Sequence, residues 1–249
     1  LIARYGIETT AMAFGIGFFV VVVGLAQLLK PPPAGYIPAG QPPKAKNSNK
    51  KEDFTPSEML RTWLFYLLWF MYACGAGAGL MVISVAKNLG KVSGAGVMAV
   101  TALAIGNGAG RIIAGVLSDK LGRKTTLFIF FVFQAIMVVL LAAAAKGGIF
   151  GAPVILSIMA ALVGANYGSN LSLFPSATKD YYGLKDFGMN YGLVFTAWGI
   201  GGYVLSQFAA SVYDGKIIES WKGSFDFAFY CSAGLLILSA IAVFILKQH

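Results

Sequence analysis

Seven apolar runs, each about 20 residues long, constrain this chain more than any other feature. A helix needs roughly 20 apolar residues to cross about 30 Å of hydrocarbon, and lipid offers no water to unpaired backbone groups, so such runs are helical. Charged residues make up 12% of the 249-residue chain, whereas soluble domains carry about 25%. We therefore expect an all-α transmembrane fold, with helices over residues 7–29, 61–86, 94–117, 125–145, 152–174, 188–212 and 226–246.

The connection between the first two runs differs from the others because it is long, proline-rich and basic. Pro31-Pro32-Pro33 opens it, and lysines gather between positions 44 and 51. A stiff proline segment followed by a flexible basic one is typical of a linker. Thr55-Pro56-Ser57-Glu58 then supplies an N-cap and a helix start. We therefore predict three regions, which are the last helix of an N-terminal bundle in residues 1–29, an inter-bundle linker in residues 30–57 and a six-helix transmembrane bundle in residues 58–249.

The basic residues predict the orientation of the chain. If the linker is cytoplasmic and the runs alternate, about twice as many Lys and Arg residues fall inside as outside, as the positive-inside rule requires. The C-terminus is then cytoplasmic. The net charge of +9 reflects basic loops beside anionic lipid rather than a nucleic-acid partner. We expect an integral protein of a bacterial or archaeal inner (plasma) membrane, surrounded by the lipid bilayer.

Arg111 is the one charge in the run from Val92 to Ser118. Inserting a lone arginine there costs roughly 2.5–3.5 kcal/mol, so a function is expected of it. It lies roughly 13 Å along the helix from Lys120, and its planar fork of donors matches a carboxylate. The alternative is a structural arginine bonded to helix carbonyls or to a carboxylate of the missing N-terminal half. Asn107, one turn earlier on the same face, contacts either the substrate or a neighbouring helix.

Residues Gly115 to Lys124 form a basic turn with the sequence Gly-Val-Leu-Ser-Asp-Lys-Leu-Gly-Arg-Lys. This turn resembles the signature loop of major facilitator superfamily transporters, which lies between helices two and three and recurs between helices eight and nine. The order of runs around it resembles helices six to twelve of a twelve-helix transporter. The resemblance implies a C-terminal six-helix bundle plus one preceding helix, and a gating motif made of Gly115, Asp119, Lys120, Gly122, Arg123 and Lys124.

The resemblance also gives the motif a mechanical role. Asp119 would accept hydrogen bonds from the N-terminus of a helix in the other bundle, in one conformational state only. The chain begins with Leu1 rather than Met, and we expect it to be a piece of a longer protein. Its partners would be a small carboxylate anion and the missing N-terminal half of the transporter.

Three further stretches, 30–38, 71–81 and 190–197, resemble the oxalate:formate antiporter family. That family exchanges small carboxylates, and its substrate arginine lies in helix eight, the position of Arg111. Aromatic residues of helices ten and eleven in the oxalate-transporting branch resemble Tyr167, Phe195 and Trp198. Such rings wall an anion site and exclude water, or they only pack. The polar residues that remain as weaker candidates are Tyr66, Tyr72, Asn166, Asn170 and Gln207.

Two departures from the family pattern bear on the substrate. Related proton-coupled carriers have an aspartate where Asn107 stands, and because an amide cannot exchange a proton, this departure argues against proton coupling by that route. The oxalate-transporting branch adds a lysine in helix eleven, whereas residues 188–213 contain no Lys or Arg and Trp198 aligns with the lysine. A second carboxylate would be unpaired at a cost of several kcal/mol. This pattern favours a monocarboxylate such as formate, lactate or pyruvate over oxalate, unless the other half supplies a second cation.

The sequence also bears on three other functions. No enzyme constellation is visible, the single histidine is His249, and Cys74 and Cys231 lie in apolar runs, so we expect no enzyme, metal site or cofactor. A transporter of sugars or drugs on the same fold and a non-transporting helical subunit of a larger complex remain as alternatives. Three Gly-x-x-x-Gly segments are interpreted as helix-packing faces, and these are residues 75–79, 106–110 and 164–168.

Overall fold

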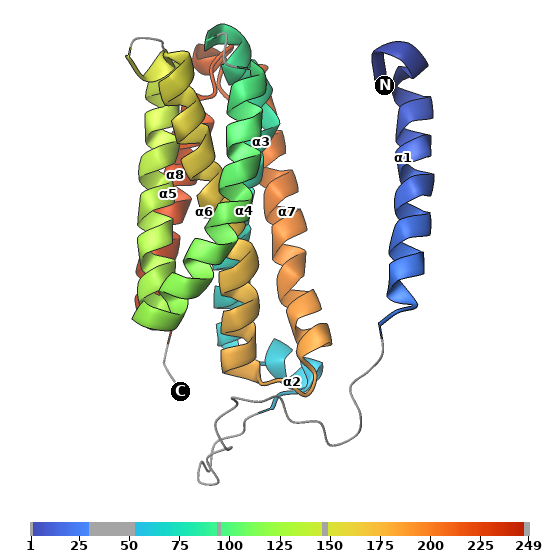
Figure 1. The fold of residues 1–249 in the computed structure, drawn as a ribbon. Helices are drawn as coiled ribbons and strands as arrows, with labels where there is room; N and C mark the ends of the chain where they lie inside the picture. Colours follow the sequence, from blue (N-terminus) through green and yellow to red (C-terminus); the bar gives the residue numbers. More distant parts are fainter. Residues whose placement is uncertain (1, 30–52, 94–95, 146–148, 247–249) are drawn as a thin grey trace. The chain divides into compact units, whose positions relative to one another are not determined.

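The computed structural model describes residues 2–29, 53–93, 96–145 and 149–246. Within these ranges the regular structure is helical throughout, and seven helices are long and apolar enough to cross a membrane, which confirms the predicted all-α transmembrane fold (Figure 1). Most of the predicted linker, residues 30–52, lies outside the described residues. The long helices are α1 (Ile2–Ala26), α3 (Trp63–Ser93), α4 (Gly96–Leu121), α5 (Arg123–Ala145), α6 (Pro153–Tyr182), α7 (Phe187–Tyr213) and α8 (Asp226–Ile245).

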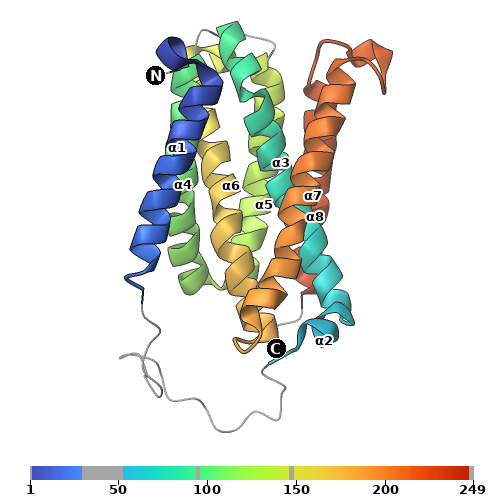
Figure 2. The ribbon, with the colours of Figure 1, turned by 90° about the vertical axis from the view of Figure 1, so that its right-hand side faces the viewer.

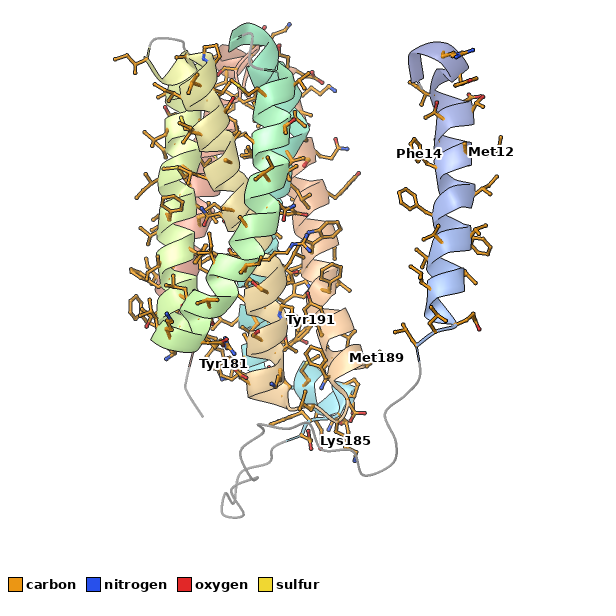
Figure 3. All side chains as sticks on the ribbon, in the orientation of Figure 1. Met12, Phe14, Tyr181, Lys185, Met189 and Tyr191 are labelled. Atoms are coloured by element: carbon orange, nitrogen blue, oxygen red, sulfur yellow. The ribbon has the colours of Figure 1, made fainter. Side chains whose placement is uncertain are left out.

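The chain divides into two units, residues 1–49 and residues 50–249. In the first unit, α1 is interrupted at Gly6, whose φ is +77°, and Thr10 Oγ1 donates to the Gly6 carbonyl at 2.7 Å. Apolar side chains such as Met12 and Phe14 are exposed along α1 (Figure 3). Because the described residues of this unit, 2–29, hold α1 as their one helix, its apolar surface must be covered by lipid or by other helices.

The second unit is a bundle of α3 to α8, with one short α-helix, α2 (Pro56–Leu60), and two 3₁₀ turns, η1 (Ile149–Gly151) and η2 (Glu219–Trp221). Its long helices run side by side (Figure 1, Figure 2). The closest pairs are α4 with α6, α3 with α7 and α5 with α8. This pairing brings α3, α4, α6 and α7, which carry the predicted site residues, into one group.

Glycines explain how closely these helices approach. A Cβ on Gly106 or Gly110 of α4 would collide with a backbone carbonyl of α6, and one on Gly164 or Gly168 of α6 would collide with a carbonyl of α4. The two Gly-x-x-x-Gly segments are therefore reciprocal packing faces, as predicted. The third segment packs as well, because a Cβ on Gly79 would be 2.7 Å from the Tyr167 ring.

The ends of two helices differ from the sequence prediction. Helix α4 continues through Asp119 and Lys120 to Leu121, and α5 begins at Arg123, so the connection is Gly122 alone. Gly122 has φ +84°, a left-handed conformation that lets one glycine end a helix and reverse the chain. Helix α6 runs through Pro175 to Tyr182 instead of ending at residue 174, because the residues around the proline are buried and packed.

The described end of the predicted linker packs on the bundle. Asp53 Oδ1 accepts the backbone N–H groups of Leu184 and Lys185, both at 3.0 Å. The Phe54 N–H donates to the Tyr182 carbonyl at 3.0 Å, and Asn190 Nδ2 donates to the Phe54 carbonyl at 2.8 Å. Residues 53–57 are thus attached to the connection between α6 and α7, and the predicted helix start follows, with a capping box at Thr55 and Glu58.

Candidate functional site

Arg111 and Asn107 lie one turn apart on α4, as their spacing predicts. The guanidinium donates to Asn107 Oδ1 from Nε and from Nη2, both at 3.4 Å. Within the described residues, Arg111 has neither an ion pair nor a hydrogen bond to a helix carbonyl. The helix carbonyl that a structural role of Arg111 would require is therefore not found in this part of the chain. Among the described groups, the guanidinium binds only the neutral side-chain amide of Asn107.

Arg111 lies on a face of the bundle that is left uncovered. Only 28% of the α4 span and 33% of the α7 span are buried in the structure, against at least 50% for α3, α5, α6 and α8. Arg111 itself is exposed, while Ala114, one turn further along α4, is fully buried. A charged side chain on an open helix face inside an apolar span indicates a cavity or a second bundle beside it.

The aromatic candidates form a continuous cluster. Phe187, Tyr191, Phe195 and Trp198 follow one another on one face of α7, with ring centroids 5.7, 5.6 and 5.4 Å apart. Tyr72 of α3 joins this row, because its hydroxyl is 3.4 Å from that of Tyr191. The row gives α7 a rigid aromatic wall towards α3 and α6. Figure 3 shows Tyr191 between α6 and α7, whereas Met189 points away from the bundle.

Tyr167 extends this wall to α6. Trp198 Nε1 donates to the Tyr167 hydroxyl at 2.9 Å, and the Tyr167 ring fills the space beside Gly79. Asn107, one turn from Arg111, packs against the residue after Tyr167, because a Cβ on Gly168 would be 2.8 Å from Asn107 Oδ1. The structure therefore joins Tyr167, Phe195 and Trp198 in one cluster. The other two predicted substrate-binding residues, Asn107 and Arg111, contact each other on α4, the helix that packs on α6.

Three members of the cluster, Phe174, Phe187 and Tyr191, were missed in the sequence. Phe174 stacks on the buried Tyr72 ring at 4.2 Å, and Tyr191 pairs with the Tyr72 hydroxyl. The spacing of Tyr191 from Phe195 and Trp198, four and seven residues, places all three on one helical face and could have identified Tyr191. Phe174 depends on a contact between helices, which spacing does not predict.

The weaker candidates separate into different environments. Tyr72 belongs to the cluster, whereas Tyr66 is 60% exposed. Asn166 and Asn170 are buried, and each side-chain amide donates to a carbonyl four residues earlier in α6. Gln207 lies farther along α7, in a separate open pocket of about 300 Å³. Of these five residues, Tyr72 alone joins the site.

The predicted gating motif is organised by Arg123. Its Nη1 donates to Ser118 Oγ at 2.7 Å and to Asp119 Oδ1 at 2.9 Å, and its Nε donates to Asp180 Oδ2 at 2.8 Å. These groups line an open depression of about 490 Å³ together with Gly122, Lys124 and Tyr181. Asp180, from the end of α6, was not part of the sequence motif. Lys120 is exposed, and a Cβ on Gly115 would meet nothing within 4 Å.

The side chains gathered at these sites are suited to binding. Within the described residues no three His, Cys, Asp or Glu side chains gather to hold a metal ion. The central cluster offers a guanidinium, tyrosine hydroxyls and aromatic walls. These groups can bind a small anion and exclude water from it.

Comparison with known proteins identifies the family of the chain. The family model described as Major Facilitator Superfamily matches residues 1–202 and 64–249. The chain is 31% identical over 209 residues to the Uncharacterized MFS-type transporter YhjX of Escherichia coli (strain K12), covering 81% of this chain and 48% of the relative. It is 26% identical over 196 residues to the Oxalate:formate antiporter of Oxalobacter formigenes, covering 77% and 44%. The chain thus spans about half the length of the curated relatives it matches.

Proposed function

Because the chain belongs to the major facilitator superfamily, a family of membrane transporters, we propose that it is part of a secondary active transporter of small carboxylate anions. The observation that carries the proposal is Arg111, a cation in an apolar span whose described partner is the neutral Asn107 amide. Once lipid or a second bundle covers this face, the cation is stable only when it is paired. A carboxylate that accepts two parallel hydrogen bonds from the guanidinium supplies that pairing.

The same arrangement favours exchange over one-way transport. When the site is empty, the Arg111 charge is uncompensated, and moving it through a low-dielectric region is costly. A bound monoanion neutralises the charge, so the loaded protein changes conformation more readily than the empty one. Asn107 takes up no proton at neutral pH. We therefore expect the binding site to return across the membrane with a second anion bound rather than with a proton. The printed name of one relative, an antiporter, supports this mode.

The charge of the substrate follows from the cations available. Helix α7 contains no Lys or Arg, and Trp198 stands where the resemblance places a lysine. One guanidinium neutralises one carboxylate, whereas a second carboxylate would be unpaired in the site. We therefore favour monocarboxylates such as formate, lactate or pyruvate. Exchange of oxalate for formate is the second candidate, and it is favoured by the 26% identity to the oxalate:formate antiporter.

The arrangement of the whole transporter is part of this proposal. Residues 1–29 provide the last helix of an N-terminal bundle, residues 30–57 the cytoplasmic linker and residues 58–249 the C-terminal bundle. The uncovered face of α4 and α7 then meets the N-terminal half across a substrate site near the membrane midplane. The C-terminus is cytoplasmic, and the protein lies in a bacterial or archaeal inner membrane.

The experiment is competition in proteoliposomes that contain the full-length protein loaded with labelled lactate. Unlabelled formate, pyruvate and lactate should drive exchange of the label, and oxalate should compete weakly. Strong, saturable exchange with oxalate would overturn the monocarboxylate preference but leave the carboxylate site in place. Exchange driven by a neutral sugar and by no carboxylate would contradict the proposal, and the absence of any transport would favour a non-transporting subunit.

A further inference from the structure

We infer that residues 53–62 form a strap that holds the last two turns of α6 against the start of α3 while the transporter changes conformation. The held segment, residues 176–182, is called the α6 tail. The inference rests on the proposed function, since it concerns the rate of the conformational change that exchange requires. It gives a mechanical role to the described end of the predicted linker, whose residues are not among the candidates for anion binding.

The α6 tail needs support from outside its own helix. Pro175 lies inside α6, directly before the tail, and has no backbone N–H, so it cannot make the usual hydrogen bond to the carbonyl of residue 171. Helices bend at such positions. Beyond this point only about two turns of α6 remain. The position of the tail therefore depends on what its far end contacts.

Tyr182, the last residue of α6, is held by the strap in three ways. The Phe54 N–H donates to the Tyr182 carbonyl at 3.0 Å, and the two rings meet edge to face at 5.5 Å. The Thr62 hydroxyl donates to the Met59 carbonyl at 2.7 Å, so in its 2.8 Å contact with the Tyr182 hydroxyl it is the acceptor. Tyr182 is 1% exposed. The strap thus holds the backbone, the ring and the hydroxyl of this buried residue.

The strap is attached to α7 as well, which keeps it in place. Asp53 accepts two N–H groups of the connection between α6 and α7, and Asn190 donates to the Phe54 carbonyl at 2.8 Å. Figure 1 shows α2, the middle of the strap, beside the start of α7. Asn190 and Met59 are fully buried. Lifting the strap would expose apolar surface and would take this acceptor from the buried Asn190 amide, so we expect the strap to stay docked throughout the cycle.

The attachment of the tail to α5 is weaker than its attachment to the strap. Arg123 donates to Asp180 at 2.8 Å, but the Asp180 side chain is 43% exposed. An ion pair that is exposed to this extent contributes little to stability. The buried contacts of Tyr182 with the strap therefore determine where the tail lies.

A docked strap makes the ends of α3, α6 and α7 one body. When the bundle turns, these ends then keep their relative positions and move together. Without the strap, the tail would bend at Pro175, and only the molecules with the tail in place would complete the change. Neither the strap nor the tail contains a predicted substrate-binding residue. The rate of exchange should therefore depend on the strap, whereas the KM should not.

The strap is tested by releasing it and then stiffening the tail in the full-length protein. The strap-release variant, Asp53→Ala with Phe54→Ala, removes the carboxylate and the ring. It should exchange labelled lactate about tenfold more slowly at an unchanged KM, since tenfold is the range of a hydrogen bond to a charged group. Adding Pro175→Ala supplies the missing N–H donor in α6 and should restore most of the rate. Pro175→Ala alone should exchange at the unmodified rate, because the docked strap already fixes the tail.

The matched control is Asp186→Ala, which removes a carboxylate from the same connection. That carboxylate makes no capping hydrogen bond to α7, so the rate should not change. A milder release is Tyr182→Phe, which keeps the buried ring and removes the hydroxyl that donates to Thr62. It should slow exchange about threefold, as expected for the loss of one neutral hydrogen bond. This variant takes the place of the strap-release variant if that protein elutes as an aggregate.

Two results in the exchange assay would overturn the strap. One is exchange at the unmodified rate in both release variants. The other is slow exchange that Pro175→Ala does not restore, because the strap would then support the fold in general and not the tail in particular.

Failure of the strap and failure of the proposed function are distinguishable. If the unmodified protein exchanges no carboxylate, the proposed function fails, and hydrogen exchange then tests the strap without transport. The amides of the α6 tail should exchange faster in the strap-release variant than in the unmodified protein, because a tail that is no longer held opens more often. Equal rates at these amides would overturn the strap whatever the substrate is.

Discussion

Arg123, the first residue of α5, donates to Asp180 near the end of α6 through a 2.8 Å bond from Nε to Oδ2. The same guanidinium binds Asp119 of α4 at 2.9 Å. One side chain therefore joins three helices at the end of the bundle that carries the gating motif. The two carboxylates differ in exposure, because the Asp119 side chain is 71% exposed and that of Asp180 is 43% exposed.

This difference predicts separate effects of removing each charge. Asp180→Asn should lower the free energy of unfolding by about 0.5–1 kcal/mol, since a partly exposed ion pair contributes about that much. Asp119→Asn should leave stability unchanged but slow exchange at constant KM, because the proposed contact of Asp119 with a helix N-terminus of the other half is lost. Thermal unfolding in detergent and exchange kinetics measure the two effects. Equal effects of both variants on exchange would contradict the separate roles.

The packing of α4 on α6 predicts a contrast between two neighbouring glycines. Gly110→Ala places a Cβ against the Ala165 carbonyl, whereas Gly108→Ala meets nothing within 4 Å. We expect Gly110→Ala to lower the free energy of unfolding by about 1–3 kcal/mol, the cost of overpacking. Gly108→Ala should change it by less than about 0.5 kcal/mol, as at other open positions. Similar melting temperatures for both variants would show that the helices can separate without cost.

Arg111 is tested by a substitution that keeps its charge. Arg111→Lys should largely abolish exchange of carboxylates while the melting temperature without substrate stays the same. One ammonium cannot reproduce two parallel N–H donors, and it shifts its protonation more readily in an apolar site. The measurement is exchange of labelled lactate, with size-exclusion elution as the control for folding. Exchange at the unmodified rate would mean that Arg111 is structural and that the anion binds elsewhere.

The docking of residues 53–57 predicts that Asp53 stabilises the connection between α6 and α7. Asp53→Ala removes the acceptor of the Leu184 and Lys185 N–H groups and should cost about 0.5–2 kcal/mol, as the loss of a capping side chain does. Hydrogen exchange at these two amides should become faster. Asp186→Ala is the control, because the Asp186 carboxylate makes no capping hydrogen bond to α7. Equal hydrogen-exchange rates at the Leu184 and Lys185 amides in both variants would contradict this role of Asp53.

The orientation of the chain is tested by cysteine accessibility. We expect residues 44–51, which lie outside the described residues, and residues 120–124 to be cytoplasmic. In intact cells, Ser48→Cys and Lys120→Cys should resist an impermeant thiol reagent, whereas Lys216→Cys should react. Rapid labelling of Ser48→Cys would reverse the predicted orientation.

Much of this protein is determined by local patterns in the sequence. Each membrane span depends on a run of apolar residues that lipid forces into a helix, so the seven helices could be predicted. The contact of Arg111 with Asn107 follows from a spacing of four residues in one helix. The Gly-x-x-x-Gly segments identify the faces on which helices pack. These features depend on neighbours within two turns, and the helical period alone brings such neighbours together.

Only the tertiary structure decided which distant residues meet. Trp198 and Tyr167 are 31 positions apart, Arg123 and Asp180 are 57 apart, and neither pair follows from the period of a single helix. The end of α6 beyond Pro175 was also decided by packing, because buried residues on both sides of the proline, such as Phe174 and Ala177, keep the segment helical. Such contacts depend on which helices pack against one another. The sequence of a single helix does not determine which helix becomes its neighbour.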